Sequence, residues 1–401
     1  MANNTLKRSL NLPLLTLYGL GTILGAGVYV LVGKVAGIAG LYAPIAFLVS
    51  SIVAIFTGLS YAALSARYPR SAGEVVYINQ AFSSATLSTW VGWCVIATGV
   101  VSAATMVNGF IGYLTVFIQT PTLLAVTLIV ASITFIAYWG IMESVTIAAL
   151  ITVLEIVGLL LVIYSLRGEL LTLPHQWQTL LPPVNGDIWL GILLGAFLAF
   201  YAFIGFEDMV NVAEEVVAPQ RTLPIAIIAA LLMASVLYIL IALAAALSLP
   251  PDALSQSDSP MVMLIENHNP QLATPLGIIS LIAIINGVLV QVIMGSRILY
   301  GMACQQLISK LFSRVSAKTQ TPTIATVTIA LTVWTLALGF PIVTLAKATS
   351  FIIITVFALV NLSLLVIRYR EKPYRLFELL MPLTGGLLCL GLLALQVVSW
   401  I

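Results

Sequence analysis

Charge is the scarcest feature of this sequence. Of 401 residues, 16 are basic and 14 are acidic, which is 7% of the chain, whereas 61% are hydrophobic. Soluble domains carry about a quarter charged residues, so this chain has too little charge to cover a water-soluble globule. The composition therefore predicts an integral membrane protein with many spans.

Cysteine and histidine are also rare. The three cysteines lie in or beside apolar runs without metal-ligand spacing, and the two histidines lie in polar loops. These absences exclude a disulfide framework, a zinc centre and a histidine-based active site inside the membrane, and no cofactor is expected. The net charge is only +2 without a long basic run, so nucleic acid is not an expected partner.

Eleven apolar runs of about 18 residues or more are separated by polar turns. We expect spans at residues 12–36, 42–65, 86–118, 122–141, 144–166, 188–213, 222–248, 273–300, 322–341, 343–367 and 377–399. This pattern predicts an all-α integral membrane protein, with residues 1–401 forming one transmembrane domain in the lipid bilayer.

The basic residues predict the orientation. With a cytoplasmic N-terminus, 13 of the 16 lysines and arginines lie on the cytoplasmic side, and only Lys34, Arg167 and Lys347 lie toward the outside. Short cytoplasmic loops are enriched in basic residues. We therefore expect a multi-pass protein of the cytoplasmic membrane with its N-terminus inside.

Two of the predicted spans carry residues that disfavour a continuous helix. The first reads GLGTILGAG at 19–27, with four glycines that each cost a helix about 1 kcal/mol. The sixth carries Gly205, Glu207 and Asp208 where hydrocarbon would lie, so this stretch must line a protein or water cavity.

The two interrupted spans are five spans apart. Such an odd offset is typical of inverted repeats that share a binding site at the membrane midplane. The predicted repeats are about 12–166 and 188–367, with an extra helix at about 377–399.

The glycine run has other interpretations. A dinucleotide fingerprint is disfavoured because it needs a preceding strand and a βαβ unit. A small-residue packing face, with Gly21 and Gly25 as G-x-x-x-G, stays open beside the broken helix, and glycines can serve both.

A break in each span would expose backbone groups at the midplane. The amides of Gly25, Ala26 and Gly27 would suit a carboxylate at the positive end of a helix dipole. The carbonyls near Ile23, and those of residues 201–204, would suit an ammonium group. Together these groups match the zwitterion of an α-amino acid.

Three segments carry a family resemblance. GLGTILGAGVYV, YPRSAGEVVYINQAF at 68–82 and FYAFIGFEDMVNVAEEVVAPQRTLP at 200–224 resemble, in order, the amino acid, polyamine and organocation permease superfamily. The resemblance implies a LeuT-type fold, which has two inverted five-helix repeats with discontinuous helices 1 and 6. It also implies transport of an amino acid or a related amine.

The resemblance implies a set of binding residues by position. Substrate would contact the first span at Ile23, Gly25, Ala26 and Gly27, and the sixth at Tyr201, Ala202 and Ile204, with Tyr201 at the place of a gating aromatic. The chain departs from its relatives in two ways. They usually have twelve spans, and they carry Arg-Asp-Gly after the eighth, where this chain has Cys304, Gln305 and Gln306.

Charged and polar side chains within spans supply further candidates. Glu155 lies midway along the fifth span, where a carboxyl out of water favours the neutral form that a proton carrier needs. The alternative for Glu155 is a permanently protonated structural acid. Glu207 could contact the substrate or a gate, or it could be a structural buried acid. Thr98 and Asn286 could line the pocket for the substrate side chain, or they could form hydrogen bonds between helices.

These observations predict a secondary transporter of amino acids that works by alternating access, with proton symport as the preferred coupling. Obligate exchange of amino acids or amines is the alternative. A sensor that binds an amino acid without transporting it is a further one, and no motif supports an enzyme. The sequence does not indicate which amino acid is bound or which oligomer forms.

Overall fold

The computed structural model is almost entirely helical. It describes residues 8, 10–25, 27–70, 73–139, 145–304, 306, 308–316, 319, 321–371 and 375–400. The α-helices are α1 (Leu12–Leu24), α2 (Gly27–Ala39), α3 (Ala43–Arg67), α4 (Gly73–Phe82), α5 (Ala85–Leu114), α6 (Thr122–Trp139), α7 (Val145–Ser165), α8 (Arg167–Gln176), α9 (Gly186–Ala199), α10 (Pro219–Ser248), α11 (Pro251–Gln256), α12 (Pro260–Glu266), α13 (Ala273–Cys304), α14 (Thr323–Gly339), α15 (Ile342–Arg370) and α16 (Leu376–Val398). The 3-10 helices are η1 (Gly40–Tyr42), η2 (Trp177–Leu180), η3 (Phe200–Phe203), η4 (Phe206–Glu215), η5 (Pro270–Leu272) and η6 (Lys310–Ser313).

The described residues include seven helical stretches long and apolar enough to cross a membrane, or eight if the pair bent by 57° after α7 counts as one span. This confirms the predicted all-α membrane fold. The stretch Leu12–Arg67 contains two predicted spans, and the apolar helices Thr122–Tyr138 and Thr323–Gly339 are too short to be counted. The total of eleven spans therefore stays a prediction.

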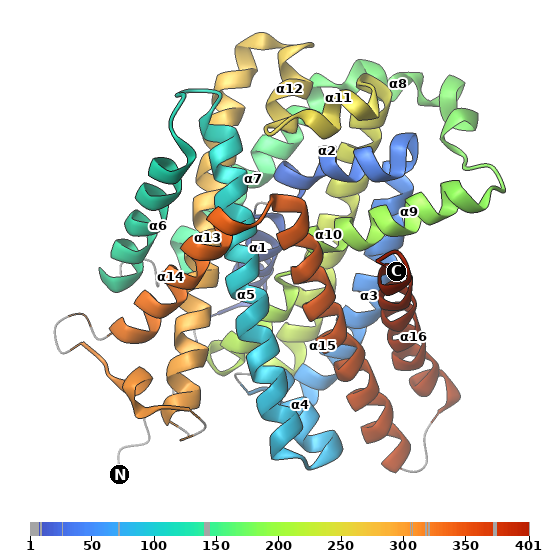
Figure 1. Cartoon of the computed structure of the whole chain (residues 1–401). Helices are drawn as coiled ribbons and strands as arrows, with labels where there is room; N and C mark the ends of the chain where they lie inside the picture. The colour runs from blue at the N-terminus through green and yellow to red at the C-terminus, as the bar shows by residue number, and fades with distance from the viewer. Residues whose placement is uncertain are drawn as a thin grey trace.

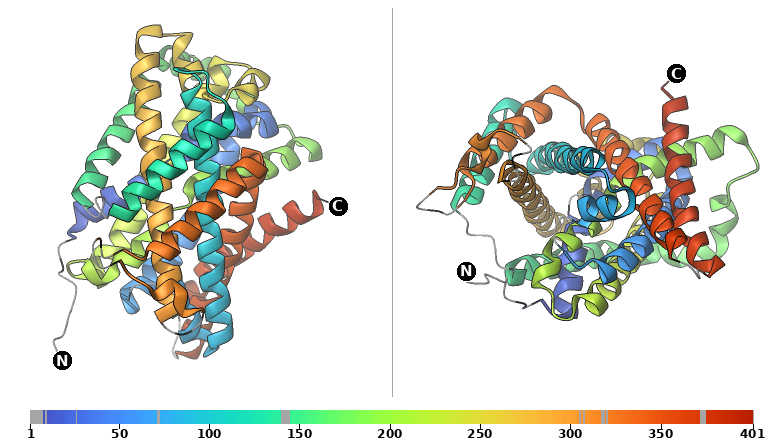
Figure 2. Two further views of the ribbon diagram at one scale, coloured as in Figure 1. Left: turned by 60° about the vertical axis from the view of Figure 1, so that its left-hand side comes forward. Right: turned by 90° about the horizontal axis from the view of Figure 1, so that it is seen from below.

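The long helices run between two ends of the molecule. At one end, uppermost in Figure 1, lie α2, α8, α11 and α12, and at the other lie α4 and η6. Helices α6 and α14 form one edge and α16 the opposite edge, in Figure 1 and in the right view of Figure 2. Helix α1 packs against α10 and α7, and its last two turns are mostly buried.

The chain is broken at two places in the interior. Helix α1 ends at Leu24 and α2 begins at Gly27, with Gly25 in a non-helical conformation between them. Helix α9 ends at Ala199 and continues as η3 to Phe203, after which Ile204 is extended and η4 begins at Phe206. Gly205 has φ +125°, a conformation that residues with a side chain rarely adopt.

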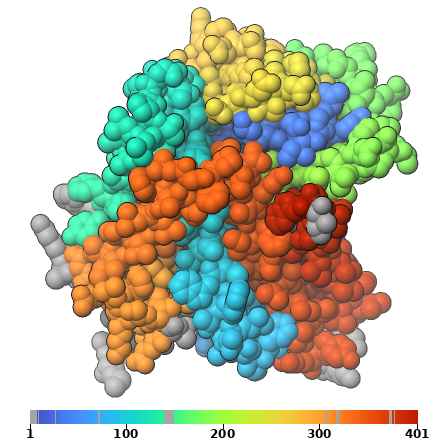
Figure 3. Space-filling view, viewed as in Figure 1, coloured from blue at the N-terminus to red at the C-terminus, as the bar shows by residue number. Residues whose placement is uncertain are grey.

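One end of the molecule is closed by the segment between α10 and α13. The amine of Lys34, on α2, donates to the carbonyls of Ser255 at 2.8 Å and Ser257 at 3.2 Å, and lies 3.5 Å from the Asp258 carboxylate. A Cβ atom at Gly33 would collide with the Leu254 carbonyl, so the segment lies directly on α2. Figure 3 shows the yellow atoms of this segment above the blue atoms of α2.

Candidate substrate site

The two breaks cross each other at Thr22 and Gly205. The Thr22 hydroxyl donates to the Gly205 carbonyl at 2.8 Å, and also to Gly19 of its own helix at 2.8 Å. A Cβ atom at Gly205 would collide with the Thr22 carbonyl. Glycine is therefore needed at this position both for its positive φ and for the close approach of the two chains.

Tyr238 of α10 joins the two breaks. Its hydroxyl lies 2.7 Å from the Ile23 carbonyl and 3.0 Å from the Ala202 carbonyl, and its side chain is buried. These are two of the carbonyls that the sequence predicts for an ammonium group. In this conformation both carbonyls accept from the same phenol.

The amides at the first break are arranged differently from one another. The Gly25 N–H donates to the Gly21 carbonyl at 3.2 Å, so in this structure it is not free for a carboxylate, contrary to the sequence expectation. Gly27 begins α2, where the first amides of a helix have no partner within it. A Cβ atom at Gly27 would lie 2.6 Å from the Ala202 Cα atom, so the two breaks also touch here. Ala26 lies outside the described residues.

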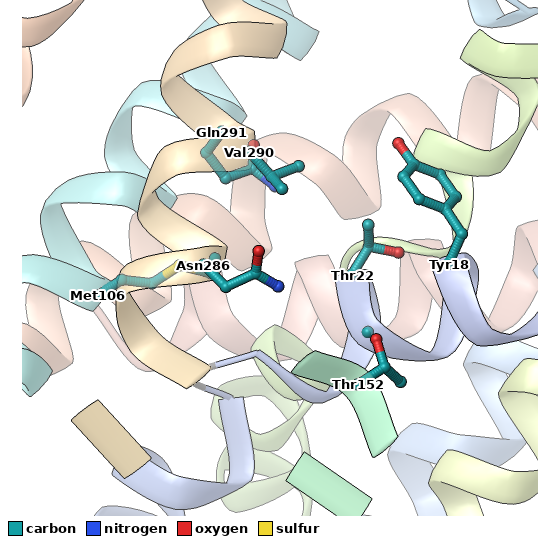
Figure 4. A pocket seen from close by; sticks show the side chains of 9 residues that line it. Tyr18, Thr22, Met106, Thr152, Asn286, Val290 and Gln291 are labelled. Carbon is teal, nitrogen blue, oxygen red and sulfur yellow. The ribbon is translucent and has the colours of Figure 1, made fainter. Parts of the chain in front are cut away.

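A narrow cavity lies one helical turn before the first break. Its lining is Tyr18, Gly21, Thr22, Met106, Thr152, Asn286, Gly287, Val290 and Gln291. Figure 4 shows the Asn286 amide pointing from α13 into the space that Thr22 and Thr152 border from the other side. Of the predicted side chains only Asn286 lines this cavity; Ile23, Tyr201 and Ile204 do not.

Glu155 lies in α7 one turn after Thr152. Its side chain is fully buried, and neither carboxyl oxygen has a partner with hydrogen-bond geometry. The Asn286 side chain is close enough to interact with it, but the Asn286 carbonyl oxygen is also unpartnered. Tyr29 of α2 donates to the backbone carbonyl of Glu155 at 2.7 Å. An acid in such surroundings is expected to be neutral, because an unpaired buried charge is costly.

The other predicted side chains have local partners. Glu207 is buried, and its carboxylate accepts the Gly205 N–H at 2.8 Å, which caps the start of η4. The Tyr201 hydroxyl lies 3.1 Å from both the hydroxyl and the carbonyl of Ser102 on α5. Thr98 donates to the Cys94 carbonyl of its own helix at 2.9 Å and lines neither cavity described here.

A wider cavity of about 570 Å³ opens toward the end that carries α4. It lies between α4, α5, η4 and α13. One face of α13 leads from the narrow cavity to the wide one, because Val290 and Gln291 line the first and Met294 and Arg297 the second. The two cavities therefore lie in succession along one face of α13, the wide one nearer the α4 end, while part of α2 is covered at the other end.

Two residues central to this arrangement were missed by the sequence analysis. Tyr238 lies in a long apolar run. Tyrosines in membrane proteins usually lie at the membrane interface, so a tyrosine in the middle of a span could have indicated a functional position. Glu74 lies in a segment quoted only for its resemblance, but it is buried with its carboxyl bonded to Tyr61 at 3.1 Å.

The sequence model of a known family, described as amino acid permease, matches residues 10–401. The chain belongs to the amino acid permease family. The predicted resemblance is thereby confirmed. The interrupted spans, the crossing at Gly205 and the buried acids are thus features of a member of this family.

Several curated proteins are similar over most of this family member. The branched-chain amino acid permease BcaP of Bacillus subtilis is 28% identical over 92% of the chain, which covers 82% of that protein. The vacuolar cationic amino acid transporter 2 of Arabidopsis thaliana is 30% identical over 91% of the chain, and human cationic amino acid transporter 4 is 27% identical over 92%. The chain spans 60% and 61% of the length of these two transporters.

Proposed function

We propose that this protein is a secondary transporter that moves amino acids across the membrane by alternating access, in symport with a proton. The observation that carries the proposal is the crossing of two broken spans beside a narrow cavity, which lies on the same face of α13 as a wider cavity toward the α4 end. Its relatives carry names of branched-chain and cationic amino acid transporters, so both substrate classes are candidates for this chain.

The breaks supply groups for the two charges of an amino acid. The substrate ammonium takes the Ile23 and Ala202 carbonyls from the Tyr238 hydroxyl, because carbonyls at helix ends attract a cation. The carboxylate binds at the start of α2, where the amide of Gly27 has no partner within the helix. Ala26 stays a candidate by its position in the sequence. In this proposal Tyr201 and Ile204 border the substrate, Glu207 holds the second break open, and Asn286 faces the substrate side chain.

Glu155 carries the proton in this proposal. Its burial, its unpartnered oxygens and the neighbouring Asn286 support a carboxyl that is neutral at rest. Thr152, one turn away on α7, lines the cavity, so rearrangement of α1 against α7 would bring water to Glu155 and allow it to release the proton.

The helices fit a LeuT-type arrangement. We propose that α1–α7 and α9–α15 are the two inverted repeats and that α16 is an added helix. We further propose a location in the cell membrane with the N-terminus in the cytoplasm, so the wide cavity opens to the cytoplasm. The basic residues of the cytoplasmic loops support this orientation.

The test is uptake of radiolabelled leucine, isoleucine, valine, arginine and lysine into proteoliposomes, with and without an inward proton gradient. We expect gradient-stimulated uptake of one of these classes. Glu155→Gln keeps the size of the side chain but has no group that can release a proton near neutral pH, so it should abolish the stimulation while exchange against preloaded substrate remains. Glu266→Gln, which removes an exposed carboxyl on α12, is the matched control.

Each other outcome contradicts a defined part of the proposal. Uptake that requires preloaded amino acid, and that Glu155→Gln leaves unchanged, would replace symport by exchange. Substrate binding without uptake in either condition would instead indicate a sensor.

A further inference from the structure

Three buried carboxyls meet where α4 packs near η4. Glu74 is 2% exposed, Glu207 is 4% and Asp208 is 6%. Glu74 comes from the first turn of α4, whereas the other two begin η4. Each interacts electrostatically with at least one of the others, and Asp208 with both. We call these three residues the carboxyl cluster.

The carboxyl cluster is held by neutral groups. Tyr61 of α3 donates to Glu74 at 3.1 Å, the Gly205 amide to Glu207 at 2.8 Å, and Gln291 of α13 to Asp208 at 3.4 Å. In the part of the chain that the structure describes, no basic side chain forms an ion pair with any of the three. Ionisation of all three carboxyls would carry a high free-energy cost, because the charges would be buried and would repel one another.

A buried hydroxyl beside the carboxyl cluster lacks a partner. The Tyr77 side chain is fully buried, and its hydroxyl makes no hydrogen bond. This hydroxyl lies against Gly73, the residue before Glu74, and interacts electrostatically with Glu74. An unsatisfied buried hydroxyl is rare and indicates that a polar ligand occupies the place.

The surrounding helices add little charge. The ionisable groups that face the carboxyl cluster are Tyr61 and Tyr77, together with Tyr18 of α1, which interacts with Asp208 and with Arg297 of α13. Helix α5 has no acidic or basic residue. Helix α15 contributes Phe357, which packs against Tyr61. A proton on the carboxyl cluster would reduce the repulsion between these acids.

We propose that Glu74, Asp208 and Glu207 share a bound proton, together with a water at the Tyr77 hydroxyl, in a proton site separate from Glu155. A proton is the ligand that fits, because no described group of His, Cys, Asp and Glu has the geometry for a metal ion. The proton reaches the site from the wide cavity, which Val75 and Asn211 line beside Glu74 and Asp208. Loss of the proton leaves repelling carboxylates between α4 and η4, which loosens their packing.

The sign of the pH effect on stability follows from Glu74, which lies outside the membrane spans. Burial raises the pKa of the Glu74 carboxyl from 4.5 to about 7, and the charge on Asp208 acts in the same direction. The folded protein therefore holds a proton between these two pH values that the unfolded chain has released. Stability is lost as the pH rises from about 4.5 to about 7 and is constant above that range. This loss should be absent in Glu74→Gln.

The direct test is infrared difference spectroscopy of the purified protein in lipid, titrated from about pH 5 to about pH 9. It needs no substrate, so the inference does not rest on the proposed transport function. We expect the carbonyl absorption of a protonated carboxylic acid to disappear as the pH passes about 7. Glu74→Gln and Asp208→Asn should each reduce the amplitude of this change or move its midpoint, and Glu266→Gln should not.

Tyr77→Phe supplies a second test with a variant that loses only an unpartnered hydroxyl. It should raise the midpoint, because the proposed water that the hydroxyl holds beside the ionised carboxylates is lost with it. The inference would be overturned by a wild-type spectrum with no carboxylic acid signal in this range. A signal unchanged in both Glu74→Gln and Asp208→Asn would overturn it equally.

Discussion

At the scale of single residues, the Tyr238 hydroxyl has the largest influence on the candidate site. One phenol satisfies carbonyls on two broken spans, Ile23 on one side and Ala202 on the other. Buried carbonyls without a donor are costly, so the breaks are stable without substrate only while this hydroxyl is in place. The same position is the one that a substrate ammonium would need.

Tyr238→Phe tests this double role. Removal of the hydroxyl leaves two buried carbonyls without a donor, which should destabilise the protein by about 1–3 kcal/mol. Added substrate should then raise the melting temperature more in the variant than in the wild type, because its ammonium replaces the missing donor. Thermal unfolding with and without a transported amino acid measures both effects.

Tyr113→Phe is the control, since Tyr113 is a buried tyrosine whose hydroxyl donates to the Tyr29 carbonyl in α2 and to neither the Ile23 nor the Ala202 carbonyl. It should lower stability without enlarging the effect of substrate. If substrate raises the melting temperature equally in both variants and in the wild type, the Tyr238 hydroxyl does not occupy the position of the substrate ammonium.

At the scale of helices, the sequence predicts where helices break better than it predicts what meets at the breaks. Four glycines in GLGTILGAG indicate an interruption through their backbone cost alone, and α1 ends within that run. The Thr22–Gly205 bond joins residues 183 positions apart, and no local pattern specifies it. In the sequence, Glu207 is likewise only a costly charge within a predicted span. In the structure its carboxylate accepts a hydrogen bond from the Gly205 amide at the start of η4.

Lys34 connects α2 to the segment that covers it. Replacement of its amine in Lys34→Met keeps the apolar stem but removes the donor to the Ser255 and Ser257 carbonyls. The loss of about 1–2 kcal/mol should increase the population open at that end by about five- to thirtyfold. We expect faster thiol labelling of Val30→Cys, because Val30 is buried in this structure and lines the cavity beside Lys34.

This labelling needs a background without the three native cysteines. Lys347→Met, which removes a lysine of α15 instead, is the control and should leave the labelling rate unchanged. If both lysine variants label at the wild-type rate, the contacts of Lys34 do not hold that end closed.

At the scale of the whole molecule, the two ends differ. The wide cavity of about 570 Å³ opens beside α4, whereas at the other end α2 is covered by the segment that contains α11 and α12 (Figure 1), beside a separate cavity of about 510 Å³ next to Lys34. Under the alternating access that we propose, one path is closed while the other is open, and we expect this arrangement to correspond to the state open beside α4. The orientation in the membrane then decides whether that state faces the cytoplasm.

Labelling from both sides of the membrane tests the state and the orientation together. In the background without native cysteines, Thr89→Cys, at the lining of the wide cavity, should react with a membrane-impermeant maleimide in inside-out vesicles and hardly at all in right-side-out vesicles. Thr179→Cys, exposed in η2 at the opposite end, should show the reverse pattern. Both positions reacting from the same side would refute the assignment of the two ends to opposite faces. With the ends assigned, faster labelling of Val30→Cys in Lys34→Met should be accompanied by slower labelling of Thr89→Cys, because a transporter that opens outward must close its inner path.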